Sequence, residues 1–189
     1  MATIAVYDAC VLYPAALRDF LLRLAEVEVV QPRWSPLILD ECFRSILRER
    51  PDLTEAALGR TRAAMGRAFP DAVVTGHEPL IESLTLPDPD DRHVLAAAIH
   101  AGATRIVTFN LRDFPSATLS TLGMRAVHPD DFVLDRIEAA PGLACVAVQN
   151  QLANLSRPPV TRSELLSWLG SQALPRSAAR LGDLLLARG

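Results

Sequence analysis

The sequence predicts an α/β protein in which a parallel β-sheet is flanked by helices on both faces and is followed by an α-helical extension. Half of the 189 residues are hydrophobic, which is enough for a buried core and excludes a disordered chain. Short apolar segments alternate with amphipathic ones as far as residue 128, a pattern typical of parallel sheets. Beyond that point the pattern is helical alone. We therefore predict an α/β domain at residues 1–128 and a helical extension at residues 129–189.

Buried strands are predicted wherever a short apolar run rich in β-branched residues lies between turn signals. The segments at 3–7 and 105–109 are the clearest, and the others are weaker. The five predicted strands lie at residues 3–7, 27–30, 72–75, 105–109 and 125–127. Helices between them would cover the sheet.

Helices are predicted from capping residues and from leucine-rich stripes. Pro14 suits a first helical position before a stripe that continues to residue 25, and Ser35 is an N-cap for the next helix. A further helix is predicted from residue 51 to 69, and a short one at 92–100 that Gly102 ends. In the extension, Thr161 begins a capping box and Pro175 opens the last helix.

Composition limits the class of protein. The net charge is −3 and all 19 basic residues are Arg, which argues against binding nucleic acid by bulk charge. Three cysteines without a C-x-x-C pair indicate reduced thiols in a cytoplasmic protein. The longest apolar runs are far below the ~20 residues of a membrane span. The first strand lacks the basic region of a secretion signal, so we expect no membrane association.

Carboxylates stand where predicted strands end or helices begin. Asp8 directly follows the first strand, and Asp113 follows the strand at 105–109. Each alone has an ordinary explanation as a cap or loop residue. Because neighbouring parallel strands end at one edge, these two acids and a helix beginning at Asp91 can meet in one crevice. Several carboxylates without a Lys or His cluster suit a hard divalent cation and metal-assisted phosphodiester cleavage.

At these residues the sequence resembles the PIN-domain ribonucleases, and within them the VapC-type toxins of bacterial toxin–antitoxin pairs. The resemblance covers about residues 3–128 and is most specific from Asp88 to Phe114, where an acidic turn, an alanine-rich helix and an apolar strand follow in order. It implies a metal-dependent endoribonuclease that cleaves RNA, a cognate antitoxin as partner, and a cytoplasmic homodimer. The helical tail is similar to an extension that a subset of these toxins carries.

The resemblance also assigns the site residues. It implies that four acids bind Mg²⁺ or Mn²⁺ and act in catalysis: Asp8, Glu41, Asp91 and Asp113. Asp91 is preferred to its neighbour Asp90, which would then be a supporting residue. Three further residues are expected at the substrate: Thr108 and Asn110 match positions beside the family's site, and Arg112 is a candidate for the scissile phosphate.

One departure from the family keeps an alternative open. Relatives commonly have a hydroxyl residue after the first aspartate and a small polar residue next, whereas this chain has Ala9 and Cys10. The loss of that hydroxyl could weaken metal placement. The alternative function is a catalytically weak PIN-like module that binds RNA or a protein. A dehalogenase-type phosphatase is disfavoured because Asp8 lacks the second acid of Asp-x-Asp. A P-loop nucleotide switch is disfavoured because its glycine run is missing.

Two other features are open to more than one interpretation. Residues 44–67 carry six Arg against three acids, which would make either a phosphate-contacting strip or an ordinary solvated face. His93 and His100 lie two helical turns apart on one side of their predicted helix. They could contact substrate, although a structural or solvated role is the expectation.

Overall fold

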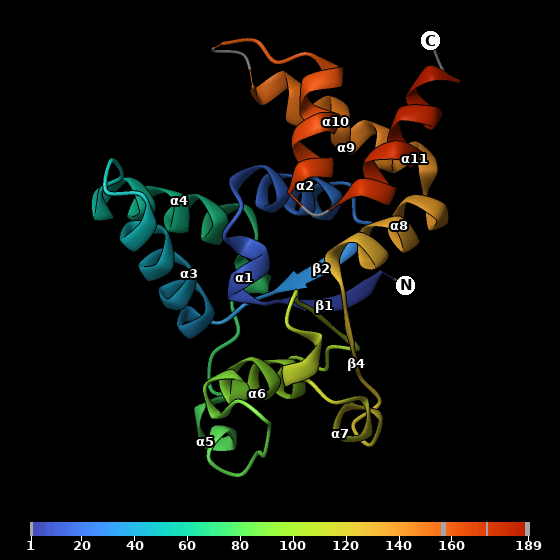
Figure 1. Ribbon diagram of the computed structural model, residues 1–189. Coiled ribbons are helices and arrows are strands. Elements are labelled where there is room, and N and C mark those ends of the chain that lie inside the picture. The colour runs from blue at the N-terminus through green and yellow to red at the C-terminus, as the bar shows by residue number, and fades with distance from the viewer. Residues whose placement is uncertain (1, 156–157, 173, 188–189) are drawn as a thin grey trace.

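The computed structural model describes residues 2–155, 158–172 and 174–187. Its centre is a sheet of four parallel strands in the order β2-β1-β3-β4 (Figure 1). The strands are β1 (Thr3–Tyr7), β2 (Val30–Arg33), β3 (Arg105–Val107) and β4 (Arg125–Val127). The predicted fold class is confirmed, and β1 lies between β2 and β3 as the proposed crevice requires.

Helices cover both faces of this sheet. The first two, α1 (Ala9–Leu12) and α2 (Ala15–Glu26), connect β1 to β2, and α3 (Pro36–Glu49) and α4 (Glu55–Ala68) follow β2. The short α5 (Glu78–Ile81) packs on α6 (Arg92–His100), which in turn contacts β1 and β3. The remaining core helix, α7 (Ser116–Ser120), precedes β4. Figure 1 shows α6 on one side of the sheet and α2 on the other.

Local sequence accounts for most helix ends. The Ser35 hydroxyl accepts a hydrogen bond from the Ile38 amide at 3.2 Å and caps α3. Helix α6 ends before Gly102, whose φ of +61° is a conformation that favours glycine. The predicted helix at 51–69 begins only at Glu55, because Thr54 provides its cap. The short α1, α5 and α7 had no clear periodicity in the sequence and were not predicted.

Two strand predictions are wrong. The strand expected at 27–30 begins only at Val30, because the turn after α2 places Glu28 at a φ of +59°. The strand then runs on through Pro32, which a sheet edge tolerates because one side of the strand needs no hydrogen bonds. The expected strand at 72–75 makes only one bridge, between Trp34 and Val73.

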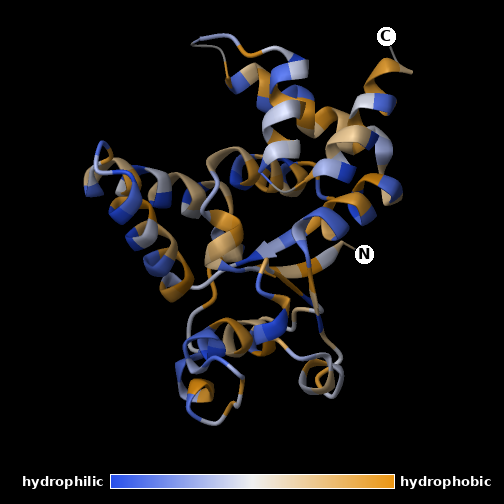
Figure 2. Cartoon of the chain, viewed as in Figure 1, coloured by the Kyte–Doolittle hydropathy of each residue, from blue (hydrophilic) through white to orange (hydrophobic). Residues whose placement is uncertain are grey.

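The C-terminal helices form a layer on the α2 side of the sheet. They are α8 (Pro129–Ala139), α9 (Pro141–Asn154), α10 (Arg162–Ser171) and α11 (Pro175–Leu186). The predicted capping box at Thr161 is present. Figure 2 shows hydrophilic and hydrophobic residues on different sides of α2, α3 and α11, as expected for amphipathic helices. No helix in the described part of the chain is both long and apolar enough to cross a membrane.

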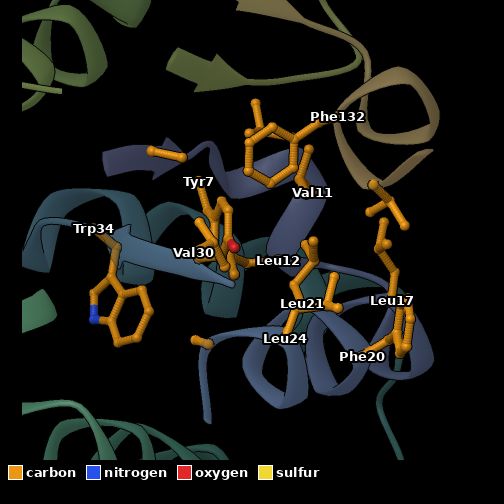
Figure 3. Packing of buried hydrophobic residues seen from close by; sticks show 14 of the residues in the cluster. Tyr7, Val11, Leu12, Leu17, Phe20, Leu21, Leu24, Val30, Trp34 and Phe132 are labelled. Carbon is orange, nitrogen blue, oxygen red and sulfur yellow. The ribbon is translucent and has the colours of Figure 1, made fainter. Parts of the chain in front are cut away.

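One continuous hydrophobic cluster joins the sheet, the core helices and the C-terminal helices. Phe132 of α8 packs edge-on against Tyr7 of β1, with ring centroids 6.3 Å apart. Figure 3 shows Phe132 above Tyr7 and Val11, with Leu12 and Leu21 close by. Helix α9 packs along α2. The predicted division after residue 128 therefore separates two segments that share one core, and a boundary there stays a prediction.

Candidate active site

Asp8 is a buried carboxylate at the carboxyl end of β1. One oxygen, Oδ1, accepts a hydrogen bond from the Ala9 amide at 2.6 Å, so the side chain also caps α1. The other oxygen, Oδ2, accepts from the Thr108 hydroxyl at 2.6 Å. Burial raises the pKa of Asp8, and the hydrogen bond from Thr108 acts in the opposite direction. These contacts fix the carboxylate in one orientation.

Thr108 and Asn110 follow β3, which ends at Val107 and not at the predicted residue 109. The chain turns away there, and Thr108 comes to face Asp8 although the two are one hundred positions apart. The Thr108 hydroxyl also accepts a hydrogen bond from the Asn110 amide at 3.0 Å. The Asn110 side chain is exposed. Thr108 thus contacts Asp8 directly, and the Asn110 backbone contacts Thr108; their role at a substrate stays a prediction.

Cys10 belongs to the same network, which the sequence did not indicate. Its thiol donates a hydrogen bond to Asp8 Oδ2 at 3.2 Å, and its sulfur accepts weakly from the Phe109 amide at 3.4 Å. Burial and the negative charge of Asp8 raise the pKa of this thiol to about 12, so it stays protonated and able to donate. The thiol therefore takes over part of the hydrogen bonding expected of the missing hydroxyl.

Asp91 lies at the centre of a group of carboxylates. It is the last residue before α6, and its side chain makes no capping hydrogen bond. The pKa of Asp91 is raised to about 7, because the carboxyl is partly buried and because four other acids repel its negative charge: Asp8, Asp88, Asp113 and Glu41. Asp8, Glu41 and Asp113, the other three predicted acids, thus each lie within electrostatic range of Asp91.

The three aspartates of the acidic turn before α6 differ in their relation to this group. Asp90 is exposed, and its backbone amide donates to the Asp88 carboxylate at 2.9 Å. Asp90 is not among the charges that raise the pKa of Asp91, whereas Asp88 is. The choice of Asp91 over Asp90 stays a prediction, and the neighbours that act on Asp91 are consistent with it. Asp88 was not predicted, although its place in the same acidic turn is a signal that could have pointed to it.

Glu41 and Asp113, the other two acids that act on Asp91, come from two different elements. Glu41 projects from the flank of α3, as predicted, and its side chain is 47% exposed. Its carboxylate Oε2 lies 3.3 Å from Nε2 of His93, the second residue of α6. Asp113 lies in a short 3₁₀ turn after β3 and its side chain is only 15% exposed. The contact between Glu41 and His93 could not be predicted without the packing of α3 on α6.

Arg112 places positive charge beside the acidic group, and the predicted arginine strip lies on α3 and α4. The guanidinium of Arg112 lies 3.6 Å from Asp113 Oδ1, and its side chain is 90% exposed. In the predicted strip at 44–67, Arg50 forms an ion pair with Asp52, and Arg62 forms one with Asp40. Such surface pairs are weak in water, so these arginines remain able to exchange partners.

The chemistry of the acidic group fits a divalent cation. Carboxylate oxygens are the ligands that Mg²⁺ and Mn²⁺ prefer, and the mutual repulsion at Asp91 is the kind that a bound cation relieves. In residues 2–155, 158–172 and 174–187, however, no three His, Cys, Asp or Glu side chains are gathered closely enough to hold one ion together. Carboxylates are thus suitable ligands for Mg²⁺ or Mn²⁺, but in this structure the side chains are too far apart to bind one ion together.

Comparison with known protein families shows which family this chain belongs to. A family model described as a PIN domain matches residues 4–112, which is more than half of the chain. The chain belongs to the PIN-domain family. Asp8, Glu41 and Asp91 lie inside the matched segment, and Asp113 follows it directly. A second family model, described as the VapC50 C-terminal domain, matches residues 129–183. The resemblance inferred from the sequence is therefore confirmed for both parts of the chain.

One curated protein is similar to this PIN-domain protein. It is named "Putative ribonuclease VapC50" and comes from Mycobacterium tuberculosis. The two sequences are 40% identical over 90 residues, which is 48% of this chain and 53% of the relative. The match thus spans about half the length of the curated relative. No solved structure matches the chain.

Proposed function

We propose that this PIN-domain protein is a metal-dependent endoribonuclease that hydrolyses RNA phosphodiester bonds as the toxin of a type II toxin–antitoxin pair. The observation that carries the proposal is the match of residues 4–112 to the PIN-domain family, within which Asp8 lies buried at the end of β1 and accepts a hydrogen bond from Thr108 at 2.6 Å. The pKa of Asp91, raised to about 7 by burial and by neighbouring acids, supports a site at which a cation would offset negative charge. The similarity to a protein named as a VapC ribonuclease supports RNA as the substrate.

Asp8, Glu41, Asp91 and Asp113 are the residues that would hold Mg²⁺ or Mn²⁺. When bound there, the ion would supply an activated water at neutral pH and offset negative charge on the phosphate. Asp8 would be the fixed member of the set, because Thr108 and the Ala9 amide already orient its carboxylate. Glu41 is exposed and its long side chain has more freedom to adjust.

Three residues would contact the RNA backbone around the acids. Arg112 presents an exposed guanidinium, which matches the geometry of a phosphate group. Asn110 projects from the same loop into solvent and could donate to a phosphate or a ribose hydroxyl. Thr108 is fully buried and would not contact the substrate itself; it would act by orienting Asp8 and the Asn110 backbone.

We further propose a cognate antitoxin as protein partner, a homodimer as the working assembly and the cytoplasm as the place of action. These assignments rest on the similarity to the VapC-type relative and on the matching C-terminal domain. Light scattering on the purified protein checks the assembly: a mass of about twice the 20.5 kDa chain is expected, and a stable monomer would contradict it.

The nuclease is tested by incubating purified protein with RNA in Mg²⁺ or Mn²⁺, with EDTA as the first control. Asp8→Asn keeps the size of the side chain but removes its charge, and we expect its cleavage rate to fall by at least about 100-fold. A matched control is Asp71→Asn, an exposed aspartate that forms no hydrogen bond or ion pair with the described residues. This control should cleave at the wild-type rate.

Each outcome decides between the candidate functions. Cleavage that persists in EDTA and in Asp8→Asn would overturn the metal site. A folded, metal-loaded wild type that binds RNA without cutting it would instead favour the catalytically weak binding module. The separation of the acidic side chains is the observation that keeps this second candidate in view.

A further inference from the structure

His93 is the second residue of α6, and its imidazole lies beside the acidic group without being one of the four acids. The side chain is 15% exposed, and Nε2 lies 3.3 Å from Oε2 of Glu41 on α3. This is the one polar contact of the ring within the described part of the chain. Because α6 also begins directly after Asp91, a single helical turn presents both Asp91 and the imidazole that meets Glu41.

Glu41 has no other anchor. Within residues 2–155, 158–172 and 174–187, the structure records no further hydrogen bond or ion pair to its carboxylate. A glutamate that is 47% exposed on a helix flank samples several rotamers in water. The contact with His93 limits that freedom, and His93 lies on the same helical turn that follows Asp91.

A purely space-filling role explains His93 poorly. Its second ring nitrogen, Nδ1, is buried and has no hydrogen-bond partner among the described residues. A buried polar atom without a partner destabilises the fold, and a leucine would fill similar volume without that cost. The polar contact that His93 does make is the one to Glu41, so the imidazole is better explained by that contact than by packing.

We propose that His93 is a positioning residue that holds Glu41 in place for the divalent cation. In this arrangement Nε2 of His93 stays 3.3 Å from Glu41 Oε2, and this polar contact limits the directions that the carboxylate can take. Polar contacts to a metal-binding side chain orient it before the ion arrives, so that less conformational freedom is lost when the ion binds. The inference rests on the proposed function, because it requires Glu41 to be a metal-binding residue.

The test measures Mn²⁺ affinity by calorimetry in the absence of RNA, so that it does not depend on turnover. His93→Leu keeps the apolar volume and removes the donor, and we expect the dissociation constant to rise by about 10-fold. His93→Gln retains an N–H donor on a side chain of similar reach and should return the affinity to within about 3-fold of wild type. His100→Leu, on the same helix but exposed, is the matched control and should leave the affinity unchanged.

A double-mutant cycle separates positioning from general damage to the fold. In a Glu41→Ala background, His93→Leu should cause no further loss of Mn²⁺ affinity, because its partner is already gone. In RNA cleavage, His93→Leu should lower kcat at saturating RNA with little change in KM. Thermal melting of each variant confirms that it is folded at the assay temperature.

The outcomes distinguish this inference from the proposed function. A wild type that binds no Mn²⁺ overturns both. A wild type that binds Mn²⁺, with a folded His93→Leu variant of equal affinity, overturns the positioning role alone. The positioning role also fails if His93→Leu causes the same loss with and without Glu41, or if His93→Gln restores nothing.

Discussion

The carboxyl of Asp91 should make the metal-free protein less stable as the pH rises toward neutrality. Its pKa is raised from 3.8 to about 7 by burial and by neighbouring acids. A carboxyl whose pKa is higher in the folded than in the unfolded state stabilises the fold while it is protonated. That contribution is complete below pH 4 and is lost as the pH rises through about 7. Asp91→Asn should therefore stabilise the metal-free protein at pH 8.

The magnitude follows from the same shift. At 1.36 kcal/mol for each pH unit, a change from 3.8 to about 7 corresponds to roughly 4 kcal/mol for a fully buried group. Asp91 is only partly buried, and solvent screens the repulsion. We therefore expect Asp91→Asn to raise the free energy of unfolding at pH 8 by about 1–2 kcal/mol. The side chain makes no capping hydrogen bond that the substitution would remove.

The assay is urea denaturation in EDTA at pH 5 and pH 8, followed by the same experiment in Mn²⁺. Without metal, the advantage of Asp91→Asn should be larger at pH 8 than at pH 5. With metal, the wild type should gain stability and the variant should gain much less. Asp90→Asn, one residue earlier and exposed, is the matched control and should change the stability by less than about 0.5 kcal/mol. A variant that is less stable than wild type at pH 8 in EDTA would refute the reasoning.

Three further predictions address the network around Asp8 and the C-terminal helices. Thr108→Val removes the hydroxyl that bonds both Asp8 and the Asn110 amide. We expect the cleavage rate to fall by at least about 10-fold and the free energy of unfolding by roughly 1–3 kcal/mol. Thr108→Ser keeps the hydroxyl and should retain activity and stability, so equal losses in the two variants would contradict this account. Phe132→Ala leaves a cavity beside Tyr7 and should lower the free energy of unfolding by about 3–5 kcal/mol. Because the core is continuous, urea denaturation should show a single transition. Two separate transitions would instead show independent domains. Asp130→Ala removes a buried carboxylate that accepts hydrogen bonds from the Ser177 amide at 2.9 Å and the Ser177 hydroxyl at 2.7 Å. It should lower the free energy of unfolding by about 2–3 kcal/mol, whereas substitution of the exposed Asp71 by Ala should have little effect.

The sequence by itself determined the parts of this protein that depend on neighbouring residues. Hydrophobic periodicity and capping residues placed α3, α6 and the capping box at Thr161, because helix caps and amphipathic faces are local properties. The class of fold followed from the alternation of strands and helices. The acidic positions were predicted from their places at strand ends and from a family pattern, and in the structure the other three act on the pKa of Asp91.

Only the tertiary structure decided the contacts between distant elements. Strand β2 was misplaced because its polar residues and Pro32 are acceptable only at the sheet edge that the fold gives it. The bond from Thr108 to Asp8 requires β3 to lie beside β1, and the contact of His93 with Glu41 requires α6 to pack on α3. Strand order and helix packing are set by how the whole core fills its space, so no local pattern contains them.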